Sequence, residues 1–291
     1  MGIRIKASGA DFSASGLGSS NWVKTYAQRA GVTDPTKVSA LQALYDSCVS
    51  ANIWSKIGGI APFPGSTTAT QKYIFSEIAF GGSFPEIEFV GNGSSVDGWT
   101  PASGVYARLP YTPSAGNKNN LSFGIYNNTA ESAPTVGGAN SVMLSTNGEA
   151  ALLTVADYRI ELGRHWGSPV SPLGKIGTRD GGTTNQTFPA TGTTDMTRKK
   201  LIQIVKDGVN LRLIDDGATV STKTDASQVP TGGGSRKLML GARMDNSGNA
   251  DLVNFSKARV ALAYWGTLTL AEAVTFNTIV NTFVTAFGRA L

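Results

Sequence analysis

The chain has 291 residues, of which 41% are apolar, so it can bury a large core in one large domain or two smaller ones. Only 15% of the residues are charged, and 35 glycines and 12 prolines indicate many turns, which favours a β-sandwich over a cytosolic α/β enzyme. The net charge of +5 comes from scattered basic residues, which argues against a nucleic-acid-binding patch, and the single cysteine excludes a disulfide within the chain.

Residues 1–20 are predicted to form an attachment arm. The first 18 residues lack the apolar segment of a signal peptide, and no run in the chain approaches a membrane span. Ile3 and Ile5 alternate with basic residues, which suits a strand added to the sheet edge of a partner. A Gly/Ser-rich stretch around Phe12 follows and cannot bury enough apolar surface to fold alone. We expect Ile3, Ile5 and Phe12 to make the attachment contacts.

Residues 21–65 are predicted to be a helical segment. A first helix spans about residues 21–30, and a second begins with Asp34 as N-cap and Pro35 at its first position. The apolar face of the second helix consists of Val38, Leu41, Leu44, Tyr45 and Cys48. Cys48 is therefore expected to be a buried, inert thiol. The sequence PFPG at 62–65 then interrupts the chain.

From residue 66 the pattern changes to short strands separated by turns. The β-rich runs are KYIFSEIAF, EIEFVG, GVYARLPY, LSFGIYN, SVMLS, EAALLTV, DYRIELG, LIQIVK, VNLRLID and RKLMLGAR. Asp207-Gly208 and Asp216-Gly217 are dipeptides suited to hairpin turns. Residues 174–197 are rich in Gly and Thr with few apolar positions, so we expect a long exposed loop there.

The chain ends on a predicted amphipathic helix. Thr269 and Glu272 fit a capping box, in which each side chain bonds the backbone N–H of the other residue. One face of the helix carries Phe276, Val280, Phe283 and Phe287, at steps of four, three and four. Gly288 ends the helix. This apolar face must pack on the rest of the fold.

The closing part of the sequence carries a first resemblance. Two Asp-Gly turns are followed by LMLGA at 238–242 and LTLAE at 268–272. This order resembles the closing half of concanavalin A-like and laminin-G-like jelly rolls, where the final helix packs along the sandwich. The resemblance implies a mainly β fold, with a concanavalin A-like jelly-roll β-sandwich over 66–291, an N-terminal helical segment and a C-terminal helix.

A second resemblance covers residues 3–18, 91–129 and 279–289. The stretches IRIKASGADFSASGLG, GNGSSVDGWTPASGVYARLPYTPSAGNKNNLSFGIYNNT and IVNTFVTAFGR are similar to segments of tailed-bacteriophage virion proteins. This similarity implies a virion protein made in the bacterial host cytoplasm without a signal peptide. Its expected partners are other capsid or tail proteins and further copies of itself, for example in a trimer, with neither nucleic acid nor membrane.

Catalytic patterns are weak in this sequence. Glu86-Ile87-Glu88 places two carboxylates on one face of a strand, but the third carboxylate of the glycosidase pattern in this fold class is missing. His165 is the only histidine, and no Gly-x-Ser-x-Gly motif accompanies it. We therefore expect a non-enzymatic protein, with glycan hydrolysis kept as an alternative.

Binding residues are predicted from side-chain chemistry. Sugars stack on aromatic rings beside amides and carboxylates, which makes glycan-contact candidates of Trp99, Tyr106, Tyr111, Asn117, Asn119, Asn120, Trp166 and Asn246. Oxygen-bearing side chains at alternate positions loosely resemble a calcium loop at Asp245, Ser247, Asn249 and Asp251. A polar turn is the alternative there, because a glycine occupies the fourth position of that stretch instead of the sixth. No other cofactor is expected.

Two functions remain open at this point. The first is a virion surface protein, such as a tail fibre, spike or head fibre, that binds host surface polysaccharide through a lectin-like domain. The second is a purely structural capsid decoration or cement protein. The first requires an exposed aromatic side chain beside convergent polar groups, and the second requires large apolar contacts with other chains.

Overall fold

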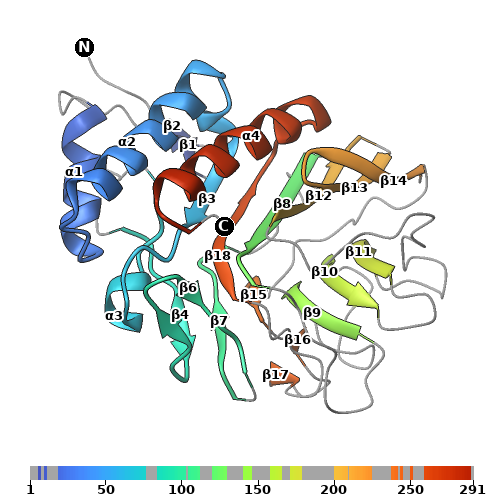
Figure 1. The fold of residues 1–291 in the computed structure, drawn as a ribbon. Helices are drawn as coiled ribbons and strands as arrows, with labels where there is room; N and C mark the ends of the chain where they lie inside the picture. Colours follow the sequence, from blue (N-terminus) through green and yellow to red (C-terminus); the bar gives the residue numbers. More distant parts are fainter. Residues whose placement is uncertain are drawn as a thin grey trace.

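The computed structural model describes residues 6–7, 10–11, 19–76, 84–102, 104–111, 120–129, 140–145, 158–165, 171–178, 200–208, 210–224, 237–241, 243–244, 250–251 and 259–289. Its helices are α1 (Ser19–Arg29), α2 (Pro35–Ser50), the 3-10 turn η1 (Trp54–Lys56), α3 (Thr68–Gln71) and α4 (Leu270–Ala286). Helices and two antiparallel sheets form three layers (Figure 1). None of the helices in these ranges is both long and apolar enough to cross a bilayer.

The larger sheet has eight strands, which are β3 (Ile57–Ala61), β5 (Ser94–Ser95), β6 (Gly98–Trp99), β8 (Asn120–Asn127), β12 (Lys200–Asp207), β13 (Asn210–Asp215), β14 (Ala218–Thr224) and β18 (Val260–Gly266). Their order is β14-β13-β12-β8-β18-β6-β5, and β3 also pairs with β18. Both predicted hairpins are present, since β12 pairs with β13 and β13 with β14, but Asp207 is the last residue of β12 and pairs with Asn210, so the first turn begins at Gly208 and not at the predicted Asp207. In the second turn Asp216 and Gly217 have φ values of 48° and 82°, as a type I′ turn requires.

The smaller sheet has six strands, which are β4 (Glu88–Val90), β7 (Tyr106–Arg108), β9 (Asn140–Ser145), β10 (Tyr158–His165), β11 (Ser171–Thr178) and β15 (Met239–Leu240). Their order is β11-β10-β9-β15-β7-β4. Strand β11 runs into the stretch 174–197, so the predicted loop is wrong at its start. Its Gly-rich sequence lacks an alternating pattern, and pairing with β10 along its whole length makes it a strand.

The first predicted strand is also corrected. KYIFSEIAF was expected to form a continuous strand, but its described part, up to residue 76, forms only isolated bridges at Tyr73 and Phe75. Strands β16 (Arg243–Met244) and β17 (Ala250–Asp251) form a separate pair. The run RKLMLGAR is interrupted between β15 and β16 by Gly241, whose φ is 80°.

The central strands of the eight-stranded sheet are buried on both faces, because their side chains alternate between two cores. Leu121, Phe123 and Ile125 of β8 point into an apolar core between the two sheets. Tyr126, which has the opposite parity, belongs to a second core that the helices complete. The alternation of strand side chains therefore divides the residues of one strand between two cores.

Helix α4 packs on the outer face of the eight-stranded sheet, α2 packs against α4, and α1 packs against α2 (Figure 1). Asp34 caps α2 with Pro35 at its first position, and Thr269 and Glu272 form the predicted capping box of α4. The predicted apolar face of α4 is confirmed, since Phe276, Val280, Phe283 and Phe287 are all buried. Cys48 is also buried on α2, and burial raises the pKa of its thiol to about 12, as expected for an inert cysteine.

The N-terminal segments meet the sandwich directly. Strand β3 lies within the segment 21–65 that was predicted to be helical, and it pairs with β18. Strands β1 (Lys6–Ala7) and β2 (Ala10–Asp11) pair with each other, whereas Ile3, Ile5 and Phe12 lie outside the described residues. The division into an arm, a helical segment and a jelly-roll domain stays a prediction.

Candidate functional site

Strands β4 and β7 form the edge of the six-stranded sheet and present an aromatic side chain beside charged groups on its outer face. Along β7, Ala107 points into the core between the sheets, while Tyr106 and Arg108 are half-buried and point away from it. Glu88 lies opposite Arg108 on β4, and Val90 lies opposite Tyr106. Antiparallel pairing brings opposite residues together on one face, so these four side chains share a surface.

The guanidinium of Arg108 organises this surface. Its Nη1 donates to Glu88 Oε1 at 2.5 Å, and its Nη2 donates to the Tyr106 hydroxyl at 3.2 Å. The guanidinium carbon also lies 5.3 Å from the centroid of the Tyr106 ring. Lys237 Nζ is 3.7 Å from the second oxygen of Glu88. We call Tyr106, Arg108, Glu88 and Lys237 the Tyr106 face; it carries two cations and one carboxylate.

The Tyr106 face is confined to the edge of the sheet. Met239 of β15 lies opposite Arg108 on the other side of β7, and it is buried. In contrast, Glu88 is exposed on β4. A ligand on this face would therefore approach from the edge strand β4 and contact the tyrosine ring and the ion pair together.

Two other aromatic candidates belong to the core. Trp99 was predicted as a glycan contact but has no exposed surface, and it packs against Phe63 and Phe89. That prediction is wrong, because Trp99 fills the space between the sheets. Tyr111 is partly buried and packs against Phe123 and Trp265 in the same core. Its ring is held by these contacts and does not stand free as a platform.

Several predicted residues are not placed. Asn120 is exposed at the start of β8. The candidates outside the described residues are Asn117, Asn119, Trp166, Asn246, Asp245, Ser247 and Asn249. Asp251 lies in β17, where only its backbone is described. Within the described ranges no three His, Cys, Asp or Glu side chains gather as a metal site would require. The calcium hypothesis therefore stays a prediction.

The carboxylates considered for catalysis are both engaged in ion pairs. Glu86 Oε2 accepts from Lys72 Nζ at 2.9 Å, and Glu86 itself lies just before β4. Glu88 is bound by Arg108 and Lys237. His165 is the last residue of β10, and its side chain is not described. Both ion pairs are exposed, so they contribute little to stability.

Of the residues on the Tyr106 face, the sequence analysis predicted Tyr106 as a glycan contact and did not predict Arg108 or Lys237 as part of the site. Arg108 had a usable signal, because it lies two positions after Tyr106 in a strand and so shares its face. Lys237 had none, since its approach to Glu88 depends on the placement of β15 beside β7, far apart in the chain.

Comparison with known proteins gives fold relatives only. No protein-family model matches the chain, and no curated protein matches it. Among solved structures, a mutant of Trypanosoma rangeli sialidase displaying trans-sialidase activity is 13% identical with a TM-score of 0.53. The match covers 96% of this chain and 42% of that chain, so this chain spans less than half of the sialidase.

Two smaller β-sandwich structures match more weakly. Domain 4 of AbnA, a GH43 extracellular arabinanase from Geobacillus stearothermophilus, is 13% identical with a TM-score of 0.42, over 76% of this chain and 98% of that chain. The CBM40 of Ruminococcus gnavus IT-sialidase is 14% identical with a TM-score of 0.41, over 62% of this chain and 96% of that chain. The predicted fold class is confirmed: the chain is a mainly β, antiparallel β-sandwich with N-terminal helices and a C-terminal helix.

Proposed function

We propose that this chain is a non-enzymatic virion surface protein whose sandwich binds host surface polysaccharide at the Tyr106 face. The observation that supports glycan binding is the half-exposed Tyr106 ring, oriented by Arg108 beside Glu88 on one face. The virion part of the proposal rests on the sequence resemblance of residues 91–129 and 279–289 to phage virion proteins.

The chemistry of the Tyr106 face suits a sugar ring. The C–H face of a sugar stacks on an aromatic side chain, and its hydroxyls bond to planar guanidinium and carboxylate groups. Arg108 contacts Tyr106 through both the hydroxyl and the ring, so the platform is oriented before a ligand arrives. Such preorganisation lowers the entropy lost on binding.

The ion pairs support binding without hydrolysis. Glycoside hydrolysis uses two carboxyl groups, one as acid and one as nucleophile or base, on opposite sides of the scissile bond. Glu86 and Glu88 are each held by basic side chains, Lys72 for the first and Arg108 with Lys237 for the second. We expect both glutamates to serve in these ion pairs, and we expect no turnover.

The binding test compares Tyr106→Ala and Tyr106→Phe, with Val274→Ser on the exposed face of α4 as a surface control. Binding to purified bacterial surface polysaccharides is measured by calorimetry. Loss of the ring should weaken binding by roughly tenfold or more, as for a buried aromatic contact, whereas Tyr106→Phe and Val274→Ser should bind nearly as wild type. Equal binding by Tyr106→Ala and wild type would refute this site.

The catalytic test follows the release of reducing ends from the same polysaccharides. We expect none from the wild-type protein. Turnover that disappears in Glu86→Gln or Glu88→Gln would show that the protein is a hydrolase and contradict the non-enzymatic proposal.

The structural alternative, a capsid decoration protein, is tested through the arm. Deletion of residues 2–18 should leave the melting temperature nearly unchanged and abolish incorporation into particles. A virion protein that binds no polysaccharide but incorporates through this arm would favour the decoration role. Full incorporation without the arm, or unfolding of the truncated protein, would refute the arm.

A further inference from the structure

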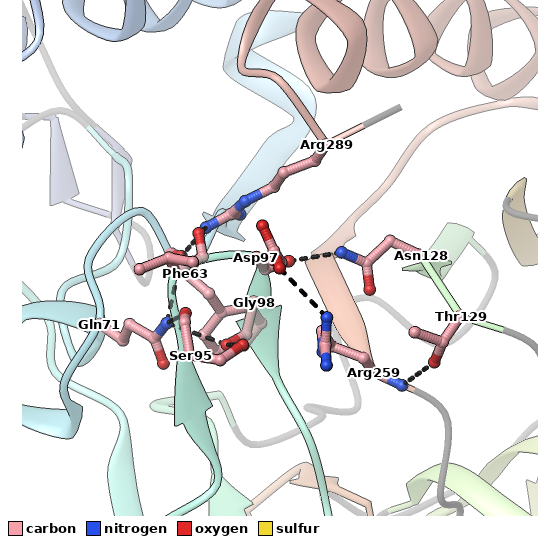
Figure 2. Close-up of polar contacts among 10 residues, drawn as sticks. Phe63, Gln71, Ser95, Asp97, Gly98, Asn128, Thr129, Arg259 and Arg289 are labelled. Carbon is pink, nitrogen blue, oxygen red and sulfur yellow. Dashed lines mark hydrogen bonds and ion pairs between the residues drawn. The ribbon is translucent and has the colours of Figure 1, made fainter. Parts of the chain in front are cut away.

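The turn between β5 and β6 is held by buried side chains from distant parts of the chain (Figure 2). Gln71 of α3 is fully buried, and its Nε2, which carries two hydrogens, lies within hydrogen-bond distance of the carbonyls of Gly65 at 2.7 Å, Ser95 at 2.8 Å and Gly98 at 3.1 Å. The Ser95 hydroxyl donates to the Gly98 carbonyl as well. Both ends of the turn are therefore fixed by a side chain that belongs to another element.

The middle of the same turn is fixed in the same way. Asn128, just after β8, donates from Nδ2 to the carbonyl of Asp97 at 2.5 Å. Arg289, which is 4% exposed, donates from Nη2 to the carbonyl of Val96 at 3.2 Å. Hence the four consecutive carbonyls of residues 95–98 all accept from side chains. A turn held at every carbonyl presents its own side chains in one fixed arrangement.

The two side chains at the tip of this turn point outward. Val96 is 60% exposed, the largest value among the large apolar side chains of the described residues. Asp97 is 51% exposed, and its Oδ2 lies 3.3 Å from Arg259 Nη1. The rigid turn thus displays an apolar knob next to a carboxylate. A single exposed apolar residue is common on protein surfaces, so its role here depends on the groups around it.

A hollow of about 170 Å³ adjoins the knob. Val96 forms one wall, and Val32, Pro64 and Ser66 line it together with Asp34 and Lys37 at the start of α2. The hollow is open to solvent and is lined by both apolar and polar side chains, and its volume admits one small aliphatic side chain. The knob and the hollow lie on one surface.

Lys37 supplies a cation at this hollow. Its Nζ lies 5.3 Å from the centroid of the Phe287 ring. Within the described residues, no carboxylate forms an ion pair with it. One surface therefore combines an apolar knob, a hollow, an exposed carboxylate and a cation available to a carboxylate.

We propose that this surface mediates association of two copies of the chain, with Val96 of each copy seated in the hollow of the other and Asp97 paired with Lys37 of the other. In a two-fold dimer the same patch faces itself, so every contact forms twice. This surface can pair with itself, because it carries both Val96 and the hollow that would receive it, and both Asp97 and the lysine that would pair with it.

The first test measures self-association by sedimentation velocity over a concentration series. Val96→Ser should raise the dimer dissociation constant by roughly tenfold or more, since it removes the knob. Val274→Ser on α4 is the matched control and should leave the constant unchanged. A wild-type protein that stays monomeric throughout the series, or equal effects of the two substitutions, would overturn the proposal.

The second test uses charge reversal. Lys37→Glu faces Asp97 of the other copy, and Asp97→Lys faces Lys37, so each variant alone should be monomeric. Mixed together, they should dimerise, because the glutamate introduced in one variant would meet the lysine introduced in the other, and the remaining native pair would also form. Lys24→Glu on the exposed face of α1 is the control. Circular dichroism checks that both variants are folded. If the folded variants do not dimerise when mixed, the Asp97–Lys37 pairing is wrong. A trimer at any mixing ratio would contradict the two-fold geometry.

Discussion

The two cores of this protein are built differently, although one sheet contributes to both. The core between the sheets is apolar at its centre, with Phe123 and Trp265 among its residues. The core beneath the helices contains polar side chains that bond across the layer. Gln203 donates to the carbonyl of Ala273 on α4 at 3.1 Å, and Ser122 accepts from the N–H of Leu268 at 3.0 Å.

This difference reflects how the position of each layer on the eight-stranded sheet is fixed. Two sheets of a sandwich are fixed relative to one another by shape and by the chain connections between them. A single helix on a flat sheet can rotate or slide with little loss of apolar contact. The buried hydrogen bonds of Gln203 and Ser122 remove that freedom, because each would be left unsatisfied if α4 moved.

The largest expected effects come from truncating the apolar residues of either core. Phe283→Ala on α4 and Phe123→Ala on β8 should each lower the free energy of unfolding by about 3–5 kcal/mol, measured by urea denaturation. Both should show one cooperative transition, because the eight-stranded sheet belongs to both cores. A separate early transition in Phe283→Ala alone would show that the helix layer unfolds independently.

The ion pair Lys200–Asp215 is the next test, because it lies on the side of the sheet that faces the apolar core. Its atoms are 2.7 Å apart, and both side chains are less than a tenth exposed. Lys200→Ala should destabilise by about 3 kcal/mol, since it removes the lysine that pairs with this buried carboxylate. The double change Lys200→Met with Asp215→Leu should cost much less. If the double variant is less stable than Lys200→Ala, the ion pair itself stabilises this core.

A smaller effect is expected from the polar contact beneath α4. Gln203→Leu should destabilise by about 2 kcal/mol, because the Tyr264 hydroxyl, which donates to Gln203 Oε1 at 2.6 Å, and the carbonyl of Ala273 both lose a buried partner. Adding Tyr264→Phe should recover part of that loss. Strict additivity of the two substitutions in a double-mutant cycle would show that the residues do not act as a pair.

The sequence predicts the parts of this fold that depend on neighbouring residues. Helix α4 is an example, because Thr269, Glu272 and the recurring phenylalanines define its start and its buried face within one segment. Strand β11 could not be predicted, since its residues carry no alternating pattern and only pairing with β10 defines it.

The candidate site shows the same limit. Trp99 follows a turn-rich stretch and was expected at the surface. Gly98 has a φ of 138° and packs so tightly that a Cβ there would lie 2.3 Å from the carbonyl oxygen of Val260. This approach brings β6 against β18 and buries Trp99. Tyr106, in contrast, is partly exposed, because it alternates with the buried Ala107 along β7, and its contact with a glycan stays a prediction.

The smallest predicted effect concerns the cap of α4 at low pH. Glu272 accepts from Lys56 Nζ and from the N–H of Thr269 at 2.9 Å. Burial alone would raise the pKa of this carboxyl, but the bonds from Lys56 and Thr269 outweigh burial and lower it. A carboxyl with a lowered folded-state pKa stabilises the fold above its unfolded pKa of about 4.3 and loses that contribution as the pH falls through the folded value.

This reasoning predicts that Glu272→Gln lowers the melting temperature at neutral pH and that the difference from wild type shrinks as the pH falls below about 4. Glu86→Gln, in the exposed pair with Lys72, serves as the control and should change the melting temperature little at any pH. A constant difference between Glu272→Gln and wild type across this pH range would mean that the charge of Glu272 does not matter. In that case the helix layer would be held by its hydrogen bonds and apolar contacts alone, and the contrast with the core between the sheets would rest on Gln203 and Ser122.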